Sequence, residues 1–201
     1  VLVAIFGPMV WVHDYRTISD LRTINPTLEN WHIFGTDLQG RDLFARTMIG
    51  LRISLMVGVV ATVVSLIIGV TWGATAGYLG GRIDNFMMRI VDVLYALPFI
   101  FFVILLLTVF ERNIVLIFAA IGAIEWLTMS RIVRGQTLAI KGKEFIEAAR
   151  AAGVSRRGII FRHILPNVIG PVAVYVTLTI PVVILAESFL SFLGLGVNEP
   201  L

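Results

Sequence analysis

The sequence predicts an all-α membrane protein, a polytopic bundle of transmembrane helices. Of its 201 residues, 58% are hydrophobic and 14% are charged, whereas a soluble domain of this size must still present a polar surface. Two long stretches, Ile53 to Leu79 and Asn167 to Ala186, carry no charged residue. Because about 20 apolar residues suffice to cross the hydrocarbon core as a helix, each stretch is long enough for a span.

Apolar and polar segments alternate along the chain, and their order predicts parts of five spans. We expect the tail of a first span at 1–12 and further spans at 53–79, 90–110, 114–130 and 167–186, separated by a polar loop at 13–51, a short turn at 80–89 and an external turn at 111–113. Pro98, Pro171 and Pro181 are expected to bend the helices that contain them. Since 12 residues make a helix of only about 18 Å, we expect this chain to be a fragment, cut at both ends.

Small residues recur every fourth position along the second predicted span. They are Ala61, Ser65, Gly69, Gly73 and Gly77. In lipid, a stripe of small side chains lets a second helix approach closely, because packing rather than hydrophobic burial joins helices there. We expect a helix-packing face, with a wall of a transport path as the alternative.

Several charged residues lie within or beside the predicted spans. Asp92 follows Arg89 by three positions, which favours an ion pair on one helix over a role in substrate binding or gating. Glu125 is expected to pair with Arg131 or with a neighbouring subunit. In the loop, the charged residues around Gly40 (Asp37, Arg41, Asp42 and Arg46) are expected to pair across a turn, with substrate contact as the alternative.

The basic residues concentrate in one segment. The net charge is +3, yet Arg131 to Pro166 holds eight Lys or Arg and two Glu, so the rest of the chain is acidic. A basic loop beside membrane spans indicates topology rather than nucleic-acid binding. The positive-inside rule places 131–166 in the cytoplasm, and alternation of the spans then places 13–51 outside.

The segment from Lys141 to Pro166 predicts two helices joined by a glycine turn. Glu144 to Ala152 are strong helix formers and Gly153 suits a helix C-terminus. Ser155 is expected to cap the next helical turn, and Leu165-Pro166 to mark the next break. On the first helix Phe145, Ala148, Ala149 and Ala152 share one face, which would let the helix enter a groove on another protein.

Three stretches carry a resemblance to a known family. Glu147-Ala148-Ala149, Gly153 and Ile164-Leu165-Pro166 together resemble the cytoplasmic coupling loop of permease subunits of binding-protein-dependent ABC importers. FGTDLQGRDLFARTMIGLRISL (34–55) and ESFLSFLGLGVNEP (187–200) resemble the corresponding segments of dipeptide and oligopeptide permeases. A basic juxtamembrane helix held to anionic lipid is the alternative for the loop.

The resemblance implies the fold of a type I ABC importer permease (MetI-like), with about five of six spans present. It divides the chain into the tail of a first span (1–12), a periplasmic loop (13–51), a permease core (52–190) with the coupling loop at 141–166, and a periplasmic segment (191–201) before a missing last span. The residues that it assigns to ATPase coupling are Glu144, Phe145, Glu147, Ala148, Ala149, Arg150, Gly153, Leu165 and Pro166. Arg150, Arg156 and Arg157 are expected to find partners on the ATPase.

The resemblance also implies partners and a location. Expected are a second homologous permease subunit in a heterodimer, two cytoplasmic ABC ATPases that bind ATP and Mg, and a periplasmic or extracellular substrate-binding protein. The subunit itself would hold no cofactor and lie in the bacterial inner membrane. Oligopeptides are the first expected substrate and dipeptides the next; nickel or another small solute is the alternative within the group.

No catalytic constellation is recognisable in the sequence. It contains no G-x-x-x-x-G-K-[ST] loop for ATP phosphates, and His13, His32 and His163 lack the spacing of a zinc site. A membrane enzyme is therefore disfavoured. An ion-coupled secondary transporter is the alternative from another class, but it should show charges at mid-span and two similar halves.

Overall fold

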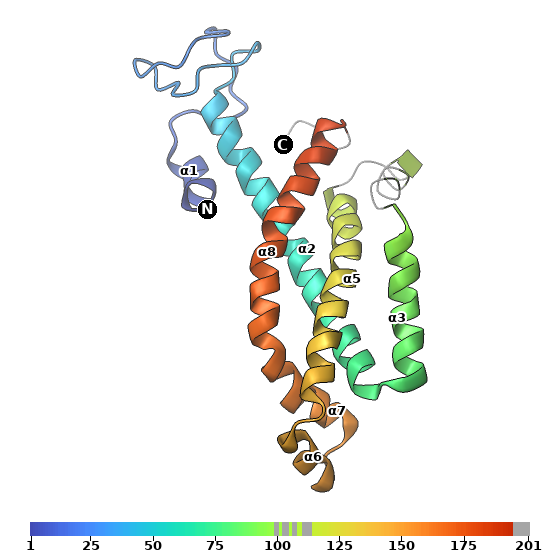
Figure 1. Ribbon diagram of the computed structural model, residues 1–201. Coiled ribbons are helices and arrows are strands. Elements are labelled where there is room, and N and C mark those ends of the chain that lie inside the picture. The colour runs from blue at the N-terminus through green and yellow to red at the C-terminus, as the bar shows by residue number, and fades with distance from the viewer. Residues whose placement is uncertain (99–100, 102–104, 106–107, 110–113, 195–201) are drawn as a thin grey trace. The chain divides into compact units, whose positions relative to one another are not determined.

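A computed structural model describes residues 1–98, 101, 105, 108–109 and 114–194, and gives the side chains of 114–121 and 123 no placement (Figure 1). Its elements are helices: α1 (Leu2–Val10), α2 (Leu43–Leu79), α3 (Gly81–Ala96), α5 (Ile114–Ile140), α6 (Glu144–Ala151), α7 (Arg156–Ile159), a π-helical turn η1 (Ile160–Ile164) and α8 (Leu165–Phe192). No strand occurs among the described residues, which confirms the all-α prediction. Among the described residues, two helical stretches are long and apolar enough to cross a membrane: Leu43–Leu79 and Arg156–Phe192.

The described part of the chain divides into two compact units, of which the first comprises Val1–Val57 and the second begins at Gly58. In the first, Asp42 caps the start of α2, because its carboxylate accepts hydrogen bonds from the Ala45 N–H (2.7 Å) and the Trp11 indole N–H (3.0 Å). The same carboxylate lies 2.9 Å from Nδ1 of His32. This cap is the reason that α2 begins at Leu43, inside the stretch 13–51 that was predicted as loop.

Asp37 holds the turn before this cap. Its carboxylate forms an ion pair with Arg46 at 2.8 Å, which confirms this one of the pairs predicted around Gly40, whereas Asp42 contacts His32. Partial burial opposes ionisation, but hydrogen bonds from the backbone N–H groups of Arg41 and Gln39 and the charge of Arg46 outweigh it and lower the pKa of Asp37.

In the second unit α5 packs against both α3 and α8, and the short helices α6 and α7 lie at one end of these longer helices (Figure 1). The core consists of apolar side chains from α2, α5, α6, α7, η1 and α8: Val70, Ala74, Met129, Val133, Ile146, Ala149, Ile159, Ile160, Ile164, Val168 and Val172. The core therefore extends from the long helices into the segment between α5 and α8.

Two predicted boundaries around α3 and α5 are wrong. Residues 80–89 are not a turn, because α3 begins at Gly81 and only Gly80, with φ +66°, separates it from α2. The helix of the fourth predicted span does not end near 130 either, since α5 continues to Ile140. Charged residues suggested loops at both places, but they pair with each other across the two helices and so remain within helical structure.

The prolines act differently from one another. α3 ends at Ala96, so Pro98 follows this helix instead of bending it as predicted, and most of the rest of the predicted span 90–110 and the turn 111–113 lie outside the described residues. Pro171 and Pro181 lie inside α8. The break predicted at Leu165-Pro166 is wrong: the helix widens into η1, where the Leu165 N–H donates to the Ile160 carbonyl, and then continues. This wider π-helical turn accommodates Pro166, which lacks a backbone N–H and carries a bulky ring.

Candidate coupling site

The predicted docking helix is present as α6, and its start is fixed by the helices before it. The Lys143 N–H donates to the carbonyl of Ile140, the last residue of α5, at 2.9 Å. Nζ of Lys141 donates to the Gly77 carbonyl at 3.1 Å, in the last turn of α2, where a cation is favoured by the helix dipole. The turn between α5 and α6 is thereby tied to α2.

The side chains of α6 divide into an inner and an outer set. Ile146 is fully buried and Ala149 is 8% exposed, and both belong to the core. Phe145 is 42% exposed, and Ala148 and Ala152 are also exposed. The predicted face therefore needs a correction: Ala149 packs inward with Ile146, which leaves Phe145, Ala148 and Ala152 as the outer apolar set.

Gly153 ends α6 in a hydrogen-bonded Schellman turn. Its φ is +78°, its N–H donates to the Arg150 carbonyl at 3.0 Å, and the Val154 N–H donates to the Ala149 carbonyl at 3.1 Å. A glycine reaches this left-handed conformation without the steric penalty of a Cβ atom. Val154, one residue further, packs against the core, so the turn leads the chain directly back to buried structure.

Ser155 caps the next helix, as the sequence predicts. Its hydroxyl accepts a hydrogen bond from the Gly158 N–H at 3.2 Å, and α7 begins at Arg156. Arg156 and Arg157 are both exposed in this first turn. Ile159 and Ile160 follow and are buried in the core.

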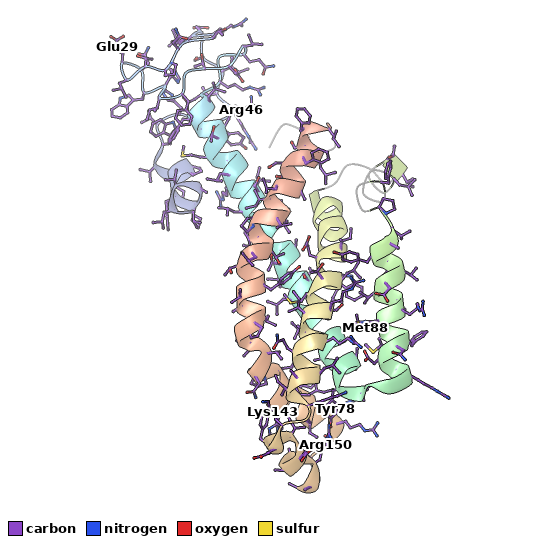
Figure 2. All side chains as sticks on the ribbon, in the orientation of Figure 1. Glu29, Arg46, Tyr78, Met88, Lys143 and Arg150 are labelled. Atoms are coloured by element: carbon purple, nitrogen blue, oxygen red, sulfur yellow. The ribbon has the colours of Figure 1, made fainter. Side chains whose placement is uncertain are left out.

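Arg150 has a partner within this chain. Its guanidinium carbon lies 5.2 Å from the centre of the Tyr78 ring, and its Nε is 3.4 Å from the Tyr78 hydroxyl. Figure 2 shows Arg150, Tyr78 and Lys143 at the same end of the second unit. Arg150 was expected to contact an ATPase, whereas here it joins the exposed side of α6 to the end of α2.

The remaining coupling residues have different surroundings. Glu144 and Glu147 are exposed in the first turn of α6. Leu165 packs against the core, whereas Pro166 is exposed at the start of α8. Glu144, Glu147 and Pro166 are therefore open to solvent in this chain, while Leu165 helps to anchor the segment.

The five small residues of the α2 stripe are all buried. A Cβ atom on Gly73 would lie 2.3 Å from the Ser130 carbonyl oxygen of α5, and one on Gly77 would lie 2.9 Å from Cβ of Thr137. A Cβ atom on Gly69 would meet Cβ of Met129 at 2.6 Å. The glycines of the stripe thus lie where α2 and α5 approach closely, which is the packing arrangement that small residues permit in lipid.

Ion pairs between α3 and α5 were not predicted from the sequence. Asp84 accepts two hydrogen bonds from Arg134, at 2.6 and 2.7 Å, and Asp92 pairs with Arg131 at 2.8 Å. The expected partner of Asp92, Arg89, is thus replaced by a residue on another helix. The sequence signal that could have predicted these pairs is the presence of acidic residues in one predicted helix and arginines in the next.

Glu125 contacts a residue other than Arg131, which was the partner expected for it within this chain. The Tyr175 hydroxyl of α8 lies 3.5 Å from its carboxylate, so Glu125 contacts α8 rather than Arg131.

Among the described residues, no group of three or more His, Cys, Asp or Glu is placed to hold a metal ion.

The sequence is similar to those of known transport proteins. Residues 69–198 match the family described as binding-protein-dependent transport system inner membrane component. The chain is 60% identical over 176 residues to the oligopeptide transport system permease protein OppC of Haemophilus influenzae, which covers 88% of this chain and 57% of that protein. It is 57% identical over 205 residues to the protein of the same name from Escherichia coli K12, covering 100% of this chain and 68% of that protein.

A dipeptide relative is more distant. The chain is 46% identical over 200 residues to the dipeptide transport system permease protein DppC of Bacillus subtilis, covering 99% of this chain and 62% of that protein. The chain thus spans between 57% and 68% of the length of these three relatives. With a family match over most of its length and this degree of identity, the chain belongs to the family of inner membrane components of binding-protein-dependent transport systems.

Proposed function

We propose that this chain is part of a permease subunit that forms the transport path of an ATP-driven peptide importer, and that α6 couples this path to a separate ATPase. Oligopeptides are the proposed substrate and dipeptides the second choice, because the relatives carry these two names. The observation that supports coupling most directly is the division of α6 into a buried side and an exposed apolar side.

The buried side of α6 gives a mechanical link to the long helices. Ile146 and Ala149 share one core with Val70 of α2, Met129 of α5 and Val168 of α8. Because a packed core resists deformation, a force on α6 would move these helices rather than compress the contact between them. We infer that closure of an ATPase pair draws α6 and these helices together, in the manner of an alternating-access transporter.

The exposed side of α6 is the proposed contact for the ATPase. Phe145, Ala148 and Ala152 form a small apolar surface with Glu144 and Glu147 beside it. ATP and Mg would be bound by that partner, and this chain would contribute no catalytic group. A second permease subunit and a substrate-binding protein complete the proposed assembly.

The basic charge of the segment supports a cytoplasmic location for it. Eight Lys or Arg lie between Arg131 and Pro166, and positively charged loops stay on the cytoplasmic side of the membrane. The loop before α2 would then lie outside, where a binding protein delivers substrate.

The test is co-purification of the assembled transporter after substitution of Phe145. Phe145→Asp places a charge on the proposed contact without removing a core residue, so we expect the ATPase to be lost while the permease still inserts. Leu38→Asp is the matched control, because Leu38 is 79% exposed and lies in the loop predicted to be outside. Retention of the ATPase by Phe145→Asp at the level of the control would contradict the proposal.

A further inference from the structure

A polar cleft lies between α3 and α5, apart from the coupling helix. Its volume is about 680 Å³, and it is lined by Asn85, Met88, Arg89, Asp92, Arg131 and Arg134. Figure 2 shows Met88 on the side of α3 that is turned toward α5. The Asp92 and Arg131 side chains are 59% and 41% exposed although they pair with each other, so the cleft is open to its surroundings.

The two exposed sides of α3 differ in chemistry. Asn85, Arg89 and Asp92 follow one another at spacings of four and three, which places them on one side of the helix. Phe86 and Val93, 68% and 58% exposed, lie seven residues apart on another side, which also carries the exposed Arg82 in the first turn of the helix. An apolar exposed side suits lipid, whereas exposed charges in membrane segments normally face water or the protein interior. We infer that the polar side of α3 faces water.

The charges of the cleft favour an anion. Three arginines line it. Two carboxylates lie near them: Asp92, which also lines the cleft, and Asp84, which pairs with Arg134. Among these residues positive charge is in excess. Arg131 is held in place by the ring of Tyr95, 4.4 Å from its guanidinium carbon, as well as by Asp92. An oriented guanidinium can bind a carboxylate through two parallel hydrogen bonds.

We propose that this cleft is a water-filled vestibule of the transport path and that its arginines bind the carboxylate of a transported peptide. This rests on the proposed function, since it names a contact for the substrate of that same path. An acyl chain would need an apolar lining, and five of the six lining residues are polar or charged, which favours a water-borne anion over a lipid.

The experiment uses single cysteines in the assembled transporter, reconstituted in nanodiscs of zwitterionic lipid. The chain itself contains no Cys. Met88→Cys places a thiol in the cleft, and Phe86→Cys is the matched control on the apolar side of the same helix. Each is treated with an anionic and a cationic methanethiosulfonate; the thiolate attacks the reagent's sulfenyl sulfur, a mixed disulfide forms and methanesulfinate leaves. Rates are normalised to those of a free thiol in solution.

We expect Met88→Cys to react about tenfold faster with the anionic reagent than with the cationic one, because the arginines concentrate anions in the cleft. Adding Arg131→Gln should reduce this preference. Phe86→Cys should react slowly with both reagents. Equal rates at the two positions, no preference for the anionic reagent, or no reaction at Met88→Cys would overturn the vestibule.

Protection from labelling tests the ligand. Trialanine should slow the anionic reagent at Met88→Cys, and trialanine amide, which lacks the carboxylate, should not. Protection by anionic lipid in the nanodisc but not by trialanine would overturn the peptide assignment in favour of a lipid headgroup. Labelling needs no transport, so peptide import is measured separately, in sealed proteoliposomes. A transporter that imports peptides there but shows no trialanine protection would refute this inference alone, whereas absence of peptide import would refute the proposed function.

Discussion

Replacing Gly153 tests whether the rigid end of α6 is needed for coupling. Gly153 has a φ of +78°, and a Cβ atom built on it meets nothing within 4 Å. The cost of a side chain is therefore conformational rather than a clash with neighbours. For a residue with a Cβ atom the left-handed conformation costs about 1–2 kcal/mol, with β-branched residues at the upper end. Gly153→Val would thus reduce the equilibrium constant for forming the Schellman turn by about 5- to 30-fold, since 1.4 kcal/mol is a factor of ten.

If the turn must be intact for α6 to transmit force, peptide-stimulated ATP hydrolysis of the assembled transporter should fall, by at most this factor, because activity follows the fraction of molecules with the turn formed. Membrane insertion should not change, because the long helices are untouched. The measurement is ATPase activity with and without binding protein and peptide, together with the amount of permease in the membrane.

Two control variants separate backbone strain from other effects. Gly153→Asn should retain most of the coupling, because Asn tolerates the left-handed region. Gly142→Val makes the same chemical change in the same segment, where φ is not positive and a Cβ atom also meets nothing within 4 Å. Unchanged coupling in Gly153→Val, or an equal loss in Gly142→Val, would refute the reasoning.

Three further predictions concern the bundle and the loop. Asp84→Asn should lower the midpoint of thermal unfolding by removing a charge-assisted bond worth about 1.5–3 kcal/mol, and the exchange Asp84→Arg with Arg134→Asp should recover part of the loss; no recovery would argue against a direct pair. Gly73→Val should disrupt the packing of α2 on α5, where a Cβ atom would lie 2.3 Å from a carbonyl oxygen, whereas Gly135→Val, with open space around it, should change yield and thermal unfolding little. Because the pKa of Asp37 is lowered in the folded chain, its contribution to stability is present above the unfolded value of about 4 and is lost as the pH falls through the lower folded value; hydrogen exchange of the loop should accelerate over that range, and Asp37→Asn should abolish this acid-dependent step.

The local signals in the sequence were sufficient for the helix, turn and cap around Gly153. Strong helix formers, a glycine and a serine at the right spacings act through contacts between residues a few positions apart, so they can be recognised without a tertiary structure. The uncharged stretches likewise identify α2 and α8, because the thickness of the bilayer fixes the length of an apolar helix.

The residues that the sequence misplaced are those whose partners come from other helices. Asp84 and Arg134 suggested loops, yet Asp84 lies in α3 and Arg134 in α5, where the two side chains pair with each other. Ala149 was assigned to the exposed side of α6, and only the core formed with α2, α5 and α8 shows that it faces inward with Ile146. A periodic pattern defines which residues share a side of a helix, but not which side meets a neighbour.

The sequence by itself thus determined that this is a helical membrane protein with a basic segment that contains the short helix α6, because composition, charge and short-range spacing are properties of the chain. Only the tertiary structure decided how that helix is anchored, through Ile146 and the Arg150–Tyr78 contact, and where α3 meets α5. The reason is physical: burial and ion pairing between distant residues depend on the packing of whole helices, which no local pattern specifies.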